Sequence, residues 1–126
     1  MDQGYVTRQD DDGTAVLAPV GEFDIATVEV LRSAILSAFE DSSRLVLDLG
    51  QTSFLDSMAL GAIIGAGKRA REAGGWVRLV APQRNIRRTL RLTEMDRVFA
   101  LYDTVDEALA HGETDEEAAL RAETTG

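Results

Sequence analysis

A nearly continuous run of apolar residues at positions 44–49 constrains the fold of this chain most strongly. The run reads RLVLDL, a pattern typical of a β-strand that is covered on both faces. Segment 76–81, which reads WVRLVA, is a second predicted strand, and a predicted helix at about 57–72, whose end is marked by Gly74 and Gly75, lies between the two. This order indicates a strand–helix–strand unit with parallel strands, and therefore an α/β fold.

Four segments carry the signals of helices. Apolar residues at helical spacing predict the first, which Asp24 or Thr27 can cap. The last begins with Thr104 and Glu107 in the spacing of a capping box. The predicted helices cover residues 27–40, about 57–72, 85–92 and 104–110.

The remaining segments complete the predicted architecture. Residues 5–7 and 14–21 predict an N-terminal hairpin, with an edge or a bulge at Pro19, which has no N–H to donate. Residues 98–102 predict a last short strand. We expect an α/β sandwich with a mixed sheet of about four to five strands, an N-terminal hairpin and covering helices. The domain is expected over residues 1–111, followed by an acidic tail at 112–126 that is predicted to be disordered.

The residue types that are missing exclude several kinds of site. The chain has no cysteine and only one histidine, His111, which excludes disulfides, iron–sulfur clusters and sites that need two imidazoles. The acidic turn at 10–12 lacks the spacing of a calcium loop. We therefore expect no metal and no cofactor. A cysteine-free chain fits a reducing compartment, so the expected location is the cytoplasm.

The charge of the chain is acidic but unevenly distributed. Its net charge of −9 opposes binding to nucleic acid or to an anionic membrane. Residues 68–97 are a basic exception, with nine basic and three acidic groups. Four of the arginines, at positions 84, 87, 88 and 91, are predicted to share one helical face. That face is either a solvated surface or a docking surface for an acidic protein partner, and nucleic acid is the least favoured interpretation.

Two patterns that could indicate an enzyme are incomplete. Ser57 lacks the G-x-S-x-G context of a hydrolase, and neither His111 nor Lys68 is placed to act as its base. Segment 61–68, which reads GAIIGAGK, lacks the Ser or Thr that follows the lysine of a P-loop. We interpret its small residues as a helix face that approaches a neighbour closely. The chain is therefore not predicted to be an enzyme.

Ser57 itself has two interpretations. As the N-cap of helix 57–72, its hydroxyl would accept hydrogen bonds from the backbone. As a phosphorylation site, it would place a phosphate near free N–H groups and the positive end of the helix dipole. The residues alone leave both open.

Over residues 4–110 the chain resembles the STAS domain family, and within it the bacterial anti-sigma factor antagonists. The resembling segments are 21–24, 45–49, 54–57, 60–61, 74–75 and 93–99. The resemblance implies that Ser57 is the phosphoacceptor and that the partner is an anti-sigma factor with serine kinase activity. The unphosphorylated form would bind this partner and free the sigma factor, and a metal-dependent serine phosphatase would restore that form.

The resemblance also implies a partner-binding surface around the serine. Asp24 and Asp56 match acidic positions at its lip, and Met58 and Gly61 belong to the same surface. Met58 replaces a residue that is often a second hydroxyl, so it bears on partner choice. Glu94 stands where glycine is more usual. The alternative function is a non-switching STAS scaffold or ligand-binding subunit of a larger regulatory assembly.

Overall fold

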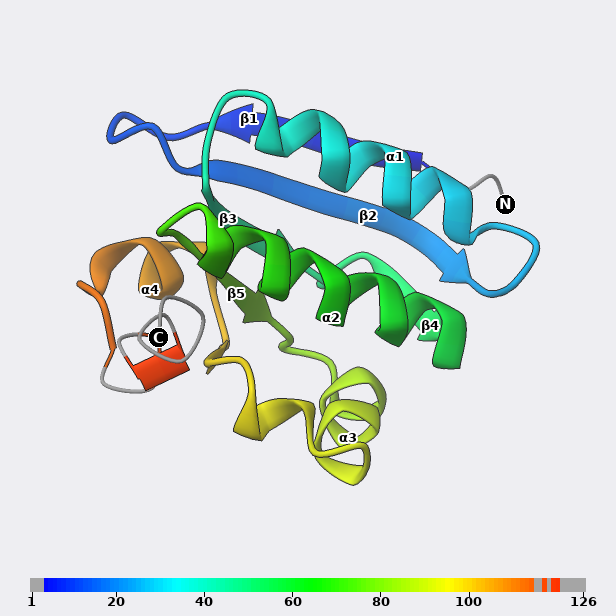
Figure 1. Cartoon of the computed structure of the whole chain (residues 1–126). Helices are drawn as coiled ribbons and strands as arrows, with labels where there is room; N and C mark the ends of the chain where they lie inside the picture. Colours follow the sequence, from blue (N-terminus) through cyan, green and yellow to red (C-terminus); the bar gives the residue numbers. More distant parts are fainter. Residues whose placement is uncertain (1–3, 115–116, 118, 121–126) are drawn as a thin grey trace.

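The computed structural model describes residues 4–114, 117, 119 and 120. It contains the predicted alternation of strands and helices, with one additional strand (Figure 1). The strands are β1 (Gly4–Gln9), β2 (Ala15–Phe23), β3 (Arg44–Asp48), β4 (Thr52–Leu55), β5 (Trp76–Val80) and β6 (Leu101–Tyr102). The helices are α1 (Val28–Phe39), α2 (Ser57–Glu72), α3 (Arg84–Leu92), α4 (Val105–Ala110) and a 3₁₀ turn at Met95–Arg97.

The strands form one mixed sheet in the order β1-β2-β3-β5-β6, with β4 paired to β2. Only the β1–β2 hairpin is antiparallel. The long strand β2 pairs with β3 through residues 15–17 and with β4 through residues 21–23. Pro19 lies between these two stretches and stays in register with Tyr5 of β1. The irregularity of the strand falls between Gly21 and Glu22 rather than at Pro19, where an edge or a bulge was predicted. The sheet thus has six strands rather than the four to five expected.

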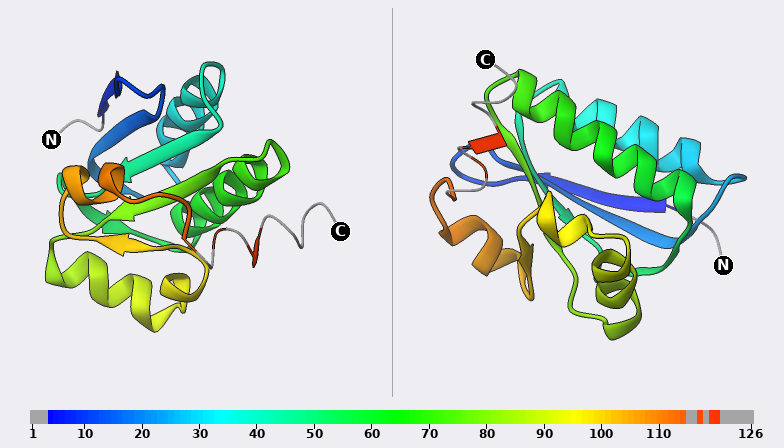
Figure 2. Two further views of the ribbon diagram at one scale, coloured as in Figure 1. Left: turned by 90° about the vertical axis from the view of Figure 1, so that its left-hand side faces the viewer. Right: turned by 60° about the horizontal axis from the view of Figure 1, so that its bottom comes forward.

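Helices cover both faces of the sheet (Figures 1 and 2). Helices α1 and α2 pack on one face, where alternate residues such as Leu17, Leu45 and Leu47 belong to the main core. The other face carries Val16 and Val46 and is covered by α4. Burial on both sides explains why β3 reads as an almost unbroken apolar run.

Two local features differ from the sequence predictions. The last strand covers only residues 101–102 of the predicted 98–102, because the N–H groups of Val98 and Phe99 donate to the Met95 carbonyl at the end of the 3₁₀ turn. Glu94 precedes that turn with a φ of 60°, a left-handed conformation that glycine adopts most readily. The small residues of α2 also divide into two groups. A Cβ at Gly67 would lie 2.6 Å from the Phe99 ring, whereas at Gly61 or Gly65 it would meet no atom within 4 Å.

Arg78 is a buried charged residue that holds the chain beyond α4. It lies in β5 opposite Val46 and is fully buried. Its guanidinium donates to both carboxylate oxygens of Glu117, each at 2.8 Å. It also donates to the carbonyls of Ala108, His111 and Gly112. Contacts with the domain therefore continue past residue 111, into the segment 112–126 that was predicted to be a tail. Residues 115–116, 118 and 121–126 of this segment lie outside the described residues.

Candidate functional site

Asp24 and Asp56 lie side by side where two neighbouring strands end. Phe23 of β2 is paired in parallel with Leu55 of β4, and each aspartate is the next residue of its chain segment. The Asp56 N–H donates to the Phe23 carbonyl at 3.0 Å. The parallel register therefore brings together two acidic residues that are 32 positions apart in the sequence.

Asp56 caps helix α2. Its Oδ1 accepts the Met58 N–H at 2.9 Å and the Ala59 N–H at 3.0 Å, and its carbonyl accepts the Leu60 N–H. Ser57 is the first helical residue. The interpretation of Ser57 as the N-cap is therefore wrong, because the preceding aspartate already performs that role.

Asp24 orders the turn before α1 in a similar way. Its Oδ1 accepts the Ala26 N–H at 2.9 Å and the Thr27 N–H at 3.2 Å. The Thr27 hydroxyl lies 3.1 Å from the same oxygen. Both aspartates are thus held by hydrogen bonds of their own loops, at neighbouring positions where β2 and β4 end.

Ser57 is exposed at this edge. In the described part of the chain its hydroxyl has no hydrogen-bond partner. Three large apolar side chains near it in sequence or register are also exposed: Ile25 is 75% exposed, Phe54 46% and Met58 40%. We call these three residues the apolar rim. Neighbouring exposed apolar side chains of this kind mark protein–protein contact sites.

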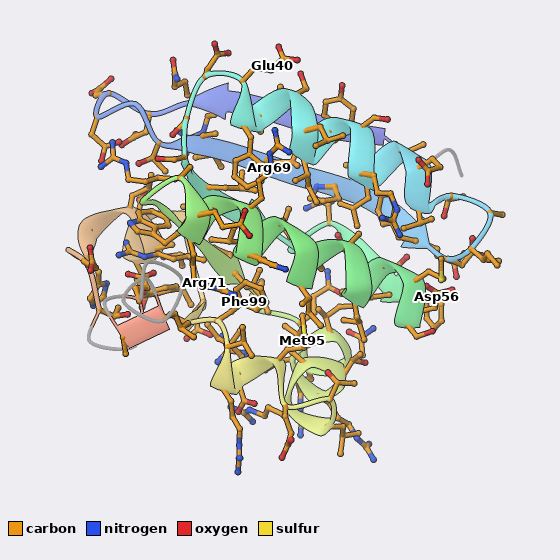
Figure 3. The ribbon with its side chains drawn as sticks, in the orientation of Figure 1. Glu40, Asp56, Arg69, Arg71, Met95 and Phe99 are labelled. Atoms are coloured by element: carbon orange, nitrogen blue, oxygen red, sulfur yellow. The ribbon has the colours of Figure 1, made fainter. Side chains whose placement is uncertain are left out.

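The outer face of α2 continues this surface away from the rim. Gly61 is exposed, and Ile64 is 48% exposed on the same helix. A cavity of about 270 Å³ lies between α1 and α2 and is lined in part by Leu36, Gly61 and Gly65. The site residues predicted from the sequence thus lie around the end of α2 that Asp56 marks in Figure 3, with Gly61 about one turn into the helix.

Ser57 has no general base in the described structure. Lys68 lies eleven residues further along the same helix, about 16 Å by helical rise. His111 follows α4, with its Nδ1 2.8 Å from the Glu107 carbonyl and its ring beside Tyr102. Catalysis by a serine nucleophile needs a base within hydrogen-bond reach, and in the described structure neither Lys68 nor His111 forms a hydrogen bond with Ser57. None of the described helices is long and apolar enough to cross a membrane.

The acidic turn near the N-terminus is part of the hairpin. Asp12 Oδ1 accepts the Thr14 N–H at 2.9 Å, and Arg44 binds the Asp12 carbonyl. The hydrogen bond from Thr14 lowers the pKa of Asp12. Among the described residues no group of three or more His, Cys, Asp or Glu side chains is arranged to hold a metal ion.

Sequence reasoning missed Ile25 and Phe54 in the site and the pairing of Arg78 in the fold. The residues around Phe54 in the sequence do not distinguish it from a core residue. Its exposure depends on the position of β4 beside β2, which the sequence does not show. The burial of Arg78 could have been predicted from the sequence, because an arginine in the middle of an otherwise apolar strand needs a buried partner.

The site thus combines an exposed serine with two neighbouring carboxylates and exposed apolar side chains on an α/β scaffold, an arrangement suited to contact with another protein. The chain belongs to the STAS domain family, whose model matches residues 5–108. It is 32% identical over 105 residues to the anti-sigma-F factor antagonist RsfB of Mycobacterium tuberculosis, covering 82% of this chain and 85% of the relative.

Solved structures agree with this assignment. The crystal structure of an anti-sigma factor antagonist from Mycobacterium paratuberculosis is 34% identical with a TM-score of 0.68, covering 86% of this chain and 92% of that one. A crystal structure from Thermotoga maritima is 28% identical with a TM-score of 0.76, covering 83% and 91%. As a member of this family the chain is a non-enzymatic regulatory protein.

Replacing Asp56 by alanine is expected to lower the free energy of unfolding by about 1 kcal/mol, because the Met58 and Ala59 N–H groups lose their acceptor. Asp56→Asn keeps an acceptor oxygen and should cost only a few tenths of that. Urea denaturation measures both changes. Equal losses for the two variants would show that the cap hydrogen bonds do not stabilise α2.

Proposed function

We propose that this protein is an anti-sigma factor antagonist that is switched by phosphorylation of Ser57. In the unphosphorylated form it binds an anti-sigma factor that is also a serine kinase, and the sigma factor is released. Phosphorylation of Ser57 by that partner ends binding, and a metal-dependent serine phosphatase restores it. We propose the cytoplasm as the place of action, in keeping with the absence of cysteine.

The observation that carries this proposal is the position of the Ser57 hydroxyl. Asp56 already caps α2, so helix formation does not require a serine at position 57. The hydroxyl is exposed and has no partner in the described structure, which leaves it accessible to a kinase. The name of the mycobacterial relative, an anti-sigma-F factor antagonist, supports an anti-sigma factor as the class of partner.

The surroundings of Ser57 supply both parts of a switch. The apolar rim gives a partner surface to bury, which favours association. A phosphoserine would add a charge of about −1.5 to −2 in the same place, next to Asp56 and close to Asp24. A bound partner would then have to cover a hydrated dianion without neutralising it. A local block of this kind needs no conformational change.

Binding of Ser57 variants to the cognate anti-sigma factor tests the proposal. Ser57→Ala should bind as wild type does and should resist release by ATP, whereas Ser57→Asp should bind at least about tenfold more weakly. Ser37→Asp, at an exposed serine of α1, is the matched control and should bind normally. Equal affinities of Ser57→Ala and Ser57→Asp, with a large homo-oligomer and no phosphate transfer, would favour the non-switching scaffold instead.

A further inference from the structure

Three arginines of α3 have no role in the fold. Arg84, Arg88 and Arg91 are exposed and lie at helical spacing on one face. No acidic side chain within the described ranges forms an ion pair with them. We call these three residues the arginine face.

Arg87, which the sequence placed on the same face, is different. It donates to the Ala81 carbonyl at 2.8 Å and to the Tyr102 carbonyl at 3.0 Å, and it pairs with Asp103 at 3.0 Å. Arg87 is therefore a structural residue that ties α3 to the sheet. Of the four arginines, Arg87 alone forms these contacts with the rest of the described fold, whereas the arginine face is exposed to solvent.

Two members of the arginine face, Arg84 and Arg88, are electrostatically unfavourable in the isolated protein, whereas Arg91 lies in the last turn of α3, where the helix dipole favours a cation. Arg84 begins α3, and no acidic residue lies in the first turn, although basic groups oppose the helix dipole at that end. Arg84 and Arg88 also form a like-charge pair at i and i+4, which destabilises a helix. A chain with 22 acidic side chains leaves this cluster unneutralised among its described residues.

The arginine face borders a cavity with a mixed lining. The cavity has a volume of about 690 Å³ and is open to solvent, because its lining comes from α3 alone: the three arginines, Asn85, Arg87 and Leu92. Leu92 is 73% exposed at the end of the helix. A ligand that fills this cavity would meet several guanidinium groups and one apolar side chain.

We propose that α3 is a docking surface for an acidic protein segment that carries apolar residues, such as an amphipathic helix rich in glutamate and leucine. Carboxylates would pair with the guanidinium groups, and an apolar side chain would cover Leu92. A polynucleotide fits less well, because the net charge of −9 repels it and α3 has no aromatic residue on which a base could stack.

The arginine face of α3 lies near the edge of the sheet at which Ser57 is located. The Asn85 amide donates to the Ser53 carbonyl of β4 at 3.2 Å, and β4 leads directly into Asp56. A partner on the arginine face would therefore approach the same edge of the sheet. The proposal does not depend on phosphorylation, because the contacts it names lie outside the Ser57 loop.

A labelled synthetic peptide of about four helical turns, with glutamates on one face and leucines on the other, tests the proposal by fluorescence anisotropy. The full chain should bind it, and the variant R84Q/R88Q/R91Q should bind at least about tenfold more weakly. The variant R8Q/K68Q/R69Q removes the same charge from exposed positions elsewhere and should stay within about twofold of wild type.

Three outcomes would overturn the proposal: no binding of the peptide, equal losses in the two triple variants, or tighter binding of a duplex DNA that is lost in R84Q/R88Q/R91Q. The melting temperature of R84Q/R88Q/R91Q should be equal to or above that of wild type, so weaker binding would not reflect unfolding. Ser57→Asp should bind the peptide normally, which separates this test from that of the phosphorylation switch.

Discussion

Replacing Arg78 by leucine is expected to lower the free energy of unfolding by about 3–5 kcal/mol, because it leaves a buried carboxylate without its partner. Glu117 is 9% exposed and receives two hydrogen bonds from Arg78. Three carbonyls that bind the same guanidinium would also lose their donor. The guanidinium further stacks on Trp76, 3.7 Å from the ring centroid.

Urea denaturation of a small set of variants distinguishes the causes of this loss. Arg78→Lys keeps the charge but not the planar fork of donors, so its cost should be intermediate. Removing both charges, in Arg78→Leu with Glu117→Leu, should recover part of the stability, because no unpaired ion is left. Arg69→Leu, at an exposed position of α2, is the control and should change the free energy of unfolding by less than about 0.5 kcal/mol. A loss below about 1 kcal/mol for Arg78→Leu would contradict this role of the pair.

Phosphorylation of Ser57 is expected to weaken binding of the anti-sigma factor at least about 100-fold, which corresponds to about 2.7 kcal/mol. The reason lies in the cap of α2. Asp56 already accepts the N–H groups of Met58, Ala59 and Leu60, so these donors are not available to a phosphate. The dipole still favours the phosphate by about 0.3–1 kcal/mol, but its oxygens stay hydrated, and a partner that covers the apolar rim must remove that water.

Titration calorimetry of the two forms, with one anti-sigma factor at two salt concentrations, measures this effect. The difference should persist at the higher salt concentration, because the cost comes from burying a charge and buried charges are screened little. The melting temperature of the protein should change by only a few degrees, since the phosphate is on the surface. A difference that disappears at high salt would indicate long-range repulsion instead of a local block.

Much of the fold followed from local patterns. The apolar run at 44–49 marked a strand buried on both faces, and the helix predicted at about 57–72, before the stop signal of Gly74 and Gly75, has the observed bounds of α2. The Thr104 hydroxyl accepts the Glu107 N–H at 3.1 Å, as the capping-box spacing predicted. Strand β4 was missed because it has four residues, half of them polar, and is a strand only through its pairing with β2. The partner of Arg78 lies 39 positions away, beyond the reach of any local pattern.

The sequence predicted the polar residues of the candidate site, but it predicted neither the residue that caps α2 nor the exposed apolar residues Ile25 and Phe54. Ser57, Asp24 and Asp56 were named from the resemblance, and the parallel register explains why the two aspartates meet. Whether Ser57 capped its own helix could not be decided from the sequence, because Ser and Asp are both good caps and stand next to each other. The exposure of Ile25 and Phe54 likewise depends on how the strands end, which a sequence of apolar and polar residues does not record.

The most direct test of the switch is the intact mass of this protein after incubation with ATP and its anti-sigma factor, followed by peptide mapping. We predict the gain of one phosphoryl group, located on Ser57, absent from Ser57→Ala, and accompanied by dissociation of the complex. Unmodified protein, or a phosphoryl group at another residue while the complex stays intact, would contradict it.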